Sequence, residues 1–439
     1  MTTHIPTVEE RRALGKACRD KLHRVDQGRW TRKSGVDVVA LLLACVQDRV
    51  QELLPIKWGR MAASPFGFFR GAVPLMAADL AAAPTTGITV QICGDAHVRN
   101  LGAFAAPDGR LIFDINDFDE TTTGPWEWDV KRLATSLVLA GREVGGSDKP
   151  CHDAVREFVS TYRNVLDQCS NMSVLELARY QVRRDLAATP VADVLRKAEK
   201  ATPQHNLEKL TELKQGARRF KEAKPLLTRV SAETTKQVLD ALSEYKKTLS
   251  SERRHFLERY CPVDVAFKVV GTGSVGTRDY VVLGFGNGPD DPLFLQVKEE
   301  PPSAYAAYVK KQPGPTHEGQ RVAEGQRLMQ AQSDIFLGWT ALDGRHYLVR
   351  QLNDHKAAIE TEDLNGHALV EFAQVCGEIL AKAHARSGDA CVLAGYCGMA
   401  DKLDKAVAEF AVAYADQTEK DYQGLLAAIK AGTLKAANP

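Results

Sequence analysis

Apolar positions recur with a helical spacing over much of the chain. Near the start, Val38, Leu42 and Val46 fall on one face of a helix predicted within residues 1–60. The middle of the chain, residues 150–260, carries helical patterns punctuated by prolines, so we expect helices throughout it. A further long helix is predicted to stop at Gly388, a residue type that commonly ends helices.

Short apolar stretches between glycine-rich turns predict strands in two regions. In the first half, "GITVQICGD" and "GRLIFDIND" (residues 87–95 and 109–117) predict one strand each. In the second half, residues 265–300 predict three strands, and residues 334–342 and 345–352 predict two more. We therefore expect an α+β protein with a five-stranded antiparallel sheet in its second half.

The chain is 439 residues long, which is too many for one ordinary hydrophobic core. Residues 1–260 are expected to form a helical lobe that contains two polar loops within residues 93–120. Residues 261–354 are expected to form the sheet lobe. Residues 355–439 are expected to return as helices to the first lobe.

Composition narrows the class of protein. The chain is 44% hydrophobic and 26% charged, with a net charge of +1, so no overall field attracts nucleic acid or membranes. Residues 178–259 hold 19 Lys and Arg against 11 Asp and Glu, which indicates a solvated helical surface or, alternatively, a docking face for an anionic partner.

The cysteines and the hydropathy pattern indicate the compartment. The nine cysteines are scattered without zinc-ligand spacing, as is typical of reduced thiols. No stretch of about 20 apolar residues occurs. We expect a soluble cytoplasmic protein without a nucleic-acid or membrane partner, and nothing in the sequence indicates the oligomeric state.

The sequence "GTGSVG" has the spacing G-x-G-x-x-G through Gly271, Gly273 and Gly276, with Ser274 among them. Dinucleotide-binding folds follow such a loop with a helix, whereas kinases follow it with a strand. Here "TRDYVVLGFG" follows, which predicts a strand. This excludes the dinucleotide-binding fold and leaves a phosphate-covering loop or a plain hairpin turn.

Lys298 lies inside the apolar strand "LFLQVKEE", 22 residues after Gly276. A buried lysine needs a partner, and the corresponding lysine of a kinase binds nucleotide phosphates and pairs with a glutamate on the next helix. Glu318 and Glu324 are the two candidates here, and we prefer Glu324 because it lies deeper in the helix. The alternative is a lysine that reaches solvent at the end of a strand.

Acidic and amide residues gather in "GDAHVRN" and "INDFDE". Phosphoryl transfer needs a carboxylate that receives the proton of the attacking hydroxyl, and oxygen ligands for Mg²⁺. Asp95, Asn100 and Asp117 supply such groups after successive predicted strands. A calcium loop of the EF-hand type is excluded because, counted from Asp114, its sixth position is not glycine.

These two motifs, with "TTTGPWEWDVKRLA" after them, resemble the catalytic and metal-binding loops of aminoglycoside phosphotransferases and choline-kinase-like enzymes. The resemblance implies that Asp95 is the catalytic base and that Asn100 and Asp117 bind Mg²⁺. It adds Asp119 as a second acidic group near the metal and Asp129 as a structural residue at the start of a helix.

Two further positions bear on this resemblance. His97 falls on a histidine of the same pattern, so it joins the candidate catalytic residues. Cys93 stands where these enzymes have a histidine before Gly-Asp, which slightly weakens the catalytic assignment. More widely, strings from Ser64 to Asp354 resemble an uncharacterised bacterial family placed near the kinase-like superfamily.

The order of the motifs is reversed relative to kinases, because the catalytic loop precedes the glycine loop and Lys298. We expect a circularly permuted, two-lobed kinase-like fold. In such a fold the helix that stops at Gly388 leads to the catalytic loop. Gly388 is therefore predicted to lie beside the strand before Cys93.

The predicted function is ATP- and Mg²⁺-dependent transfer of the γ-phosphoryl group to a hydroxyl of a small molecule or protein. AMP transfer by the same fold is an alternative, and so is a non-catalytic nucleotide-binding regulator. Arg60 and Arg70 are candidates for contacts to phosphates or an anionic substrate, or for surface salt bridges.

Overall fold

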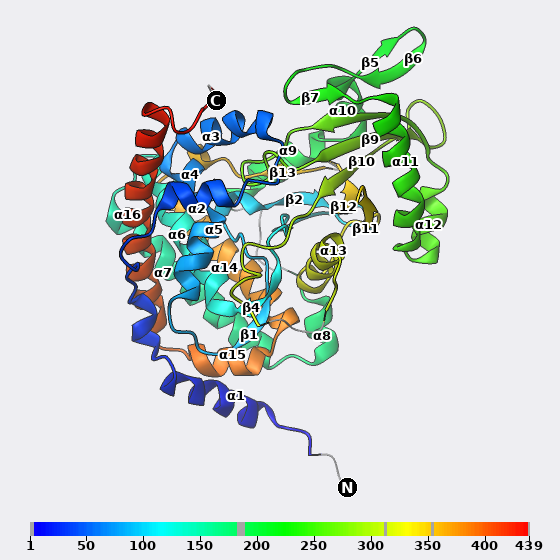
Figure 1. Ribbon diagram of the computed structural model, residues 1–439. Coiled ribbons are helices and arrows are strands. Elements are labelled where there is room, and N and C mark those ends of the chain that lie inside the picture. Colours follow the sequence, from blue (N-terminus) through cyan, green and yellow to red (C-terminus); the bar gives the residue numbers. More distant parts are fainter. Residues whose placement is uncertain (1–3, 182–188, 311–313, 353–354, 438–439) are drawn as a thin grey trace.

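The computed structural model describes residues 4–181, 189–310, 314–352 and 355–437. It shows a mixed α+β protein in which a large helical body lies beside an antiparallel sheet with helices of its own (Figure 1). The last residue of the family resemblance, Asp354, and residues 182–188 of the basic segment fall outside the described residues.

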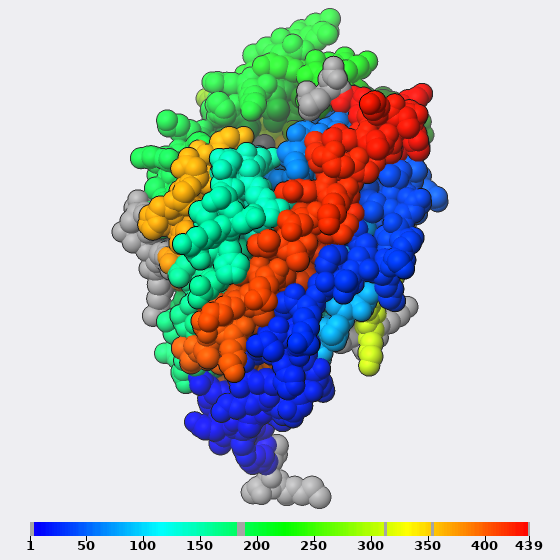
Figure 2. All heavy atoms as spheres, turned by 90° about the vertical axis from the view of Figure 1, so that its left-hand side faces the viewer, coloured from blue at the N-terminus to red at the C-terminus, as the bar shows by residue number. Residues whose placement is uncertain are grey.

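The helical body contains segments from both ends of the chain. Its helices are α1 (Val8–Ala17), α2 (Val38–Ala44), α3 (Leu54–Ala62), α4 (Pro65–Gly71), α5 (Val73–Ala81), α6 (Trp126–Glu143), α7 (Asp148–Ser170), α8 (Val174–Arg179), α9 (Val191–Lys200), α14 (His367–Ser387), α15 (Ala390–Cys397) and α16 (Lys402–Lys430). Helix α16 runs diagonally across one face of the molecule, between the N-terminal segments and α7 (Figure 2).

Helix α6 is the centre of this body, because every residue from Trp126 to Gly141 is buried. A helix that is enclosed on all sides is normally apolar all round, yet α6 buries Glu127, Asp129, Lys131 and Arg132. Buried charges of this kind need partners. Two of them, Asp129 and Arg132, hold the loop that follows β1.

Two small sheets are embedded in the helical body. One pairs β1 (Thr89–Ile92) with β4 (Thr122–Pro125), and the other has the order β13 (Ala357–Ala358), β2 (Leu101–Ala105), β3 (Leu111–Ile115). All of these pairings are antiparallel. The loops after β1 and β3 carry the two polar motifs of the sequence.

The larger sheet has six strands rather than the expected five, in the order β11-β12-β10-β9-β8-β7. Its strands are β7 (Leu227–Arg229), β8 (Cys261–Lys268), β9 (Asp279–Phe285), β10 (Pro292–Glu299), β11 (Gly338–Leu342) and β12 (Arg345–Gln351). The unexpected strand is β7, at the edge beside β8. Because a segment of three residues is too short to show an alternating pattern, β7 carries no strand signal in the sequence.

The middle region is not helical throughout, as had been expected. It contains α10 (Pro203–Leu210), α11 (Ala232–Lys247) and α12 (Ser251–Leu257), but also a hairpin of β5 (Thr211–Lys214) and β6 (Ala217–Phe220). The two turn residues, Gln215 and Gly216, both have positive φ, as short hairpin turns require. Helix α11 packs against the large sheet, and α13 (Glu318–Met329) lies between that sheet and the helical body.

Gly388 lies beside β1, so the predicted proximity is confirmed. A Cβ atom at Gly388 would lie 2.5 Å from Cγ1 of Val90, and the hydroxyl of Ser387 donates to the carbonyl of Gln91 over 3.2 Å. The end of α14 therefore meets the strand that leads into the first polar motif, although 295 residues separate Gly388 from Cys93. Among the described residues, no helix is long and apolar enough to cross a membrane.

A buried arginine fixes the N-terminal segment to the helical body. Arg32 contacts Asp79 on α5 over 2.6 Å and Asp421 on α16 over 2.7 Å, and all three side chains are at most 10% exposed. Replacing Arg32 with Met leaves two buried carboxylates without their cation. The free energy of unfolding should fall by about 3–5 kcal/mol, as measured by urea denaturation.

Arg29→Met is the matched control, because the Arg29 side chain is 82% exposed and pairs only with Asp26. This variant should change the free energy of unfolding by less than about 1 kcal/mol. Equal losses in the two variants would contradict the assigned role of Arg32.

Candidate functional site

One cavity joins the acidic motifs to the glycine loop. It is lined by Asp95, His97, Asn100, Asp117, Asp119 and Glu120 on one side and by Gly271, Thr272, Gly273, Ser274 and Thr277 on the other. Most of these residues were predicted from the sequence. They line one cavity although the two segments lie about 155 positions apart. Gly276 closes the loop behind this lining, where a Cβ atom would lie 3.0 Å from the Cβ of Arg49.

Asp95 is held by a buried arginine on α6. The guanidinium of Arg132 contacts Oδ1 of Asp95 over 2.6 Å, and it also stacks over the Phe69 ring at 4.2 Å. Burial raises the pKa of Asp95, although Arg132 acts in the opposite direction. The carboxylate therefore has a fixed position, with Oδ2 left for other contacts.

His97 lies next to Asp95, with 3.7 Å between its Nε2 and Oδ2 of Asp95. Burial, with further help from Arg70 and Arg132, lowers the pKa of His97 well below its usual range. The imidazole is therefore neutral at pH 7. Its Nδ1 is buried and has no hydrogen-bond partner among the described residues.

Asp129 anchors the loop that carries Asp95. Its carboxylate accepts hydrogen bonds from the backbone N–H groups of Cys93 and Gly94, over 2.8 and 2.9 Å. Nε2 of His384, on α14, lies 3.3 Å from the same carboxylate. This agrees with the structural role that the resemblance implied for Asp129, and it explains how a thiol can stand at position 93 without loss of the anchor.

Three oxygen-bearing side chains are available to hold a cation. The amide nitrogen of Asn100 donates to the carbonyl of Asp95 over 3.0 Å, which leaves the amide oxygen free. Asp117 lines the same cavity, and Oδ1 of Asp119 is buried without a hydrogen-bond donor. These hard oxygen donors suit Mg²⁺, which usually takes one or two carboxylates and completes its shell with water and phosphate.

The described residues contain no cluster of three or more His, Cys, Asp or Glu side chains arranged to hold a metal ion. A Mg²⁺ ion here would therefore depend on the amide of Asn100 and on ligand oxygens as well as on the carboxylates. The residues fit a metal that arrives with a phosphate-bearing ligand.

Lys298 pairs with Asp119, not with a glutamate on the next helix. Its side chain is 2% exposed, and its ammonium contacts Oδ2 of Asp119. Asp119, assisted by Asp117, raises the pKa of Lys298 against the effect of burial, while Lys298 holds the pKa of Asp119 below its usual range although burial opposes it. The ion pair is therefore fully charged.

The expected pairing of Lys298 with Glu324 is not observed. Glu324 is exposed and accepts a hydrogen bond from Gln320 over 2.7 Å. The other candidate, Glu318, pairs with Arg321. The position of a glutamate within the next helix did not predict the partner of Lys298, because the carboxylate that contacts Lys298 belongs to the acidic motif.

The glycine loop connects β8 to β9, and these two strands pair in antiparallel fashion. Gly271 and Gly276 have φ of +62° and +93°, which favours glycine at both positions. The loop therefore has the strand–turn–strand context that distinguishes it from a dinucleotide-binding loop.

Cations from an N-terminal segment hold the carbonyl groups of this loop. Arg49 donates to the carbonyls of Gly273 and Val275, the latter over 2.7 Å, and Lys57 donates to that of Gly273 over 3.1 Å. Arg60 donates to the carbonyl of Gly271 and forms no salt bridge with the described residues, while its contact with a phosphate or an anionic substrate stays a prediction. Sequence reasoning missed Arg49, in a bend, and Lys57, on α3, since neither stands in a recognisable motif.

Several backbone N–H groups of the glycine loop have no partner among the described residues. Among the described residues, the backbone N–H groups from Thr272 to Gly276 have no hydrogen-bond acceptor. Arg70 also lines the cavity, and it forms no ion pair with the described residues, while its buried Nε has no hydrogen-bond partner. One wall of the cavity thus offers unpaired donors, and the opposite wall offers carboxylates.

A family model described as "Uncharacterized protein conserved in bacteria (DUF2252)" matches residues 49–428, and the chain belongs to this family. The matched region contains both polar motifs, the glycine loop and Lys298. No curated protein and no solved structure matches the chain. The family resemblance of the sequence motifs is confirmed, and the likeness to kinase-like enzymes stays a prediction.

If Arg49 holds the glycine loop, its removal should loosen the loop. Arg49→Met should increase hydrogen exchange of the Thr277 amide, which donates to the carbonyl of Ser274 in the loop over 3.0 Å, by about tenfold, the equivalent of one lost hydrogen bond to a charged donor. Hydrogen–deuterium exchange read by mass spectrometry measures this. Arg259→Met is the control, because Arg259 is exposed and contacts only Asn287, and unchanged exchange in Arg49→Met would contradict the assignment.

Proposed function

We propose that this protein is an ATP- and Mg²⁺-dependent phosphotransferase that moves the γ-phosphoryl group to a hydroxyl group. The observation that carries the proposal is that Asp95, Asn100 and Asp117 line one cavity together with the glycine loop, whose N–H groups from Thr272 to Gly276 have no acceptor among the described residues. Phosphoryl transfer depends mainly on positioning and charge stabilisation. A wall of donors opposite a wall of carboxylates supports that chemistry.

The glycine loop is suited to phosphate oxygens. Successive free backbone N–H groups form an anion-binding concavity, and the loop keeps them free because its carbonyls are held by Arg49, Lys57 and Arg60. The guanidinium groups of Arg49 and Arg60 also add positive charge next to the loop. Arg70 supplies a further unpaired guanidinium for the transferring group.

Asp95 is suited to receive the proton of the acceptor. The acceptor oxygen attacks the γ-phosphorus, the bond to the bridging oxygen of ADP breaks, and the hydroxyl proton passes to the carboxylate. The contact with Arg132 fixes Oδ1, so Oδ2 is the proton acceptor. The raised pKa of Asp95 makes it a better base than an exposed aspartate.

Bound Mg²⁺ would neutralise charge on the phosphates, with Asn100 and Asp117 as its protein ligands. Asp119 adds Oδ1, while its Oδ2 stays on Lys298. Because Lys298 is already paired, its contribution is to hold the acidic motif against β10. The kinase-like, permuted fold belongs to the same proposal and is supported by the position of Gly388 beside β1.

Asp95→Asn should lower phosphoryl transfer by about 10²–10⁴-fold, because an amide cannot take the proton. Transfer is measured from γ-labelled ATP to hydroxyl compounds in a metabolite extract, with α-labelled ATP run in parallel. Label should pass from the γ position only. Wild-type transfer by Asp95→Asn would refute the assigned base, and transfer of α-label would show AMP transfer instead.

Asp117→Asn should weaken binding of ATP in the presence of Mg²⁺ and leave Mg²⁺-free binding almost unchanged. Thermal unfolding with ATP, with and without Mg²⁺, measures this difference, since a ligand that binds the folded state raises its stability. Asp108→Asn is the matched control, because Asp108 is exposed and contacts Arg110. An equal Mg²⁺ effect in Asp117→Asn and wild type would exclude Asp117 as a ligand.

A further inference from the structure

A second cavity lies on the other side of the segment that carries the acidic motif. It is lined by Phe104, Ala105, Asn116, Gln326, Gln330, Asp334, Arg350, Gln351 and Lys356. Asn116 belongs to this cavity, whereas the next residue, Asp117, lines the first one. The two cavities are therefore neighbours across one peptide unit.

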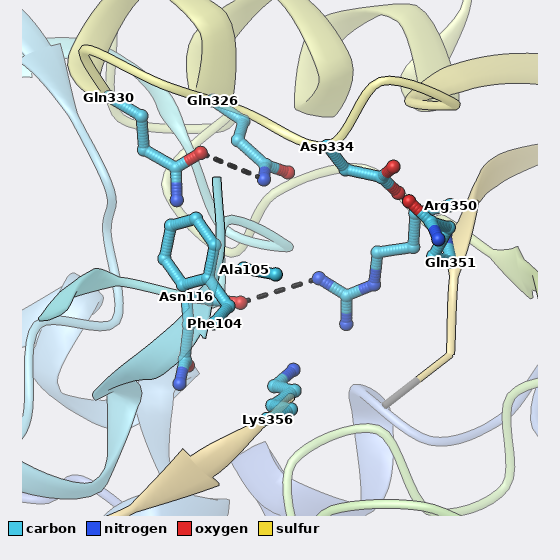
Figure 3. Close-up of a pocket in the computed structure, with 9 residues that line it drawn as sticks. All are labelled: Phe104, Ala105, Asn116, Gln326, Gln330, Asp334, Arg350, Gln351 and Lys356. Carbon is cyan, nitrogen blue, oxygen red and sulfur yellow. Dashed lines mark hydrogen bonds between the residues drawn. The ribbon is translucent and has the colours of Figure 1, made fainter. Parts of the chain in front are cut away.

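Two cations that form no ion pair with the described residues point into this space. Figure 3 shows the guanidinium of Arg350 and the ammonium of Lys356 directed toward the same opening, across from the ring of Phe104. Arg350 donates to the side-chain oxygen of Gln296 over 3.0 Å and to the carbonyl of Asn116 over 3.3 Å, both uncharged acceptors. Lys356 forms no hydrogen bond or ion pair with the described residues.

The one carboxylate in the lining is occupied by the backbone. Asp334 accepts the N–H of Phe336 over 2.8 Å and that of Gln351 over 2.5 Å. Burial, together with the nearby Arg350, lowers the pKa of Lys356 to about 7. Burial thus makes positive charge in this cavity costly, and an anion between the two cations would offset that cost.

We propose that this cavity is a binding site for a phosphate group, distinct from the phosphate wall formed by the glycine loop. A phosphate monoester carries about two negative charges at neutral pH, which matches one guanidinium and one ammonium. A carboxylate would leave one positive charge unbalanced in a half-buried space. Gln326, Gln330 and Asn116 add amide groups around the same opening.

The phosphate has two possible sources. It belongs to a phosphorylated acceptor whose hydroxyl reaches Asp95, or it is a phosphate of the nucleotide that extends past Asn116. The role of the cavity in the reaction rests on the proposed function, whereas its affinity for phosphate does not.

Calorimetric titration with inorganic phosphate tests the site directly. Lys356→Met should raise the dissociation constant at least about tenfold, the effect of 1.4 kcal/mol of lost attraction, while Lys356→Arg should retain most of the affinity. Lys214→Met is the matched control, because Lys214 is exposed on β5. Arg70→Gln should leave the Lys356-dependent phosphate binding unchanged, because Arg70 lines the other cavity.

A second measurement uses the wild-type chain alone. A lysine with a pKa near 7 reacts rapidly with acetic anhydride at neutral pH, and mass spectrometry reports the extent at each lysine. Phosphate should slow the modification of Lys356 at least about fivefold, because an anion at hydrogen-bond distance favours the protonated amine. The modification of Lys214 should not change.

Repetition with saturating Mg²⁺ and ATP identifies the source of the phosphate. If phosphate still binds to the ATP-loaded protein, the site takes the phosphate of an acceptor. If ATP prevents phosphate binding and Lys356→Met binds ATP more weakly, the site takes a phosphate of the nucleotide. The site is refuted if phosphate does not bind, if Lys356→Met binds it as wild type does, or if only Arg70→Gln loses it. Phosphate binding without any ATP binding would leave the site standing and count against the proposed function.

Discussion

The ion pair between Asp119 and Lys298 is the contact on which the arrangement of the candidate site depends. It joins the acidic motif of the helical body to the buried C-terminal end of β10, across 179 positions of sequence. Neighbouring bonds extend it: the Ser303 hydroxyl donates to the carbonyl of Glu120 over 2.8 Å, and Arg321 donates to that of Asp119 over 3.0 Å. Both charges are largely removed from water, so either one alone would be strongly destabilising. The pair therefore fixes the distance between the carboxylates and the sheet that presents the glycine loop.

In the rest of the site, too, buried charged side chains hold backbone groups in place. Asp129 holds the N–H groups of the loop before Asp95, and Arg49 holds the carbonyls of the glycine loop. In each case a charged side chain satisfies the backbone groups. The loop N–H groups from Thr272 to Gly276 and Nε of Arg70 have no protein partner among the described residues. A polar ligand with negative charge can therefore bind without breaking protein contacts, which lowers the cost of binding.

Local sequence patterns predicted what depends on local physics. The strand after the glycine loop, the buried strand around Lys298 and the helix that ends at Gly388 were all visible in periodicity and turn residues. The motif spacing also identified the residues that line the cavity. The sequence did not show which residues would pair. Lys298 pairs with Asp119 rather than with Glu324, and Arg49 binds carbonyl groups of the glycine loop from more than 200 positions away. These contacts follow from how the segments pack, and a three-residue edge strand such as β7 is formed by pairing with β8 rather than by its own pattern.

The central claim is that the two motifs form one nucleotide site. The most direct measurement is a crystal structure of the chain with Mg²⁺ and a non-hydrolysable ATP analogue. The account predicts phosphates against the N–H groups of Thr272 to Gly276, and a Mg²⁺ ion bound by Asn100 and Asp117 with Asp95 facing the γ-phosphate. A nucleotide bound elsewhere on the protein, or phosphates bound away from the glycine loop with no metal at Asp117, would contradict it.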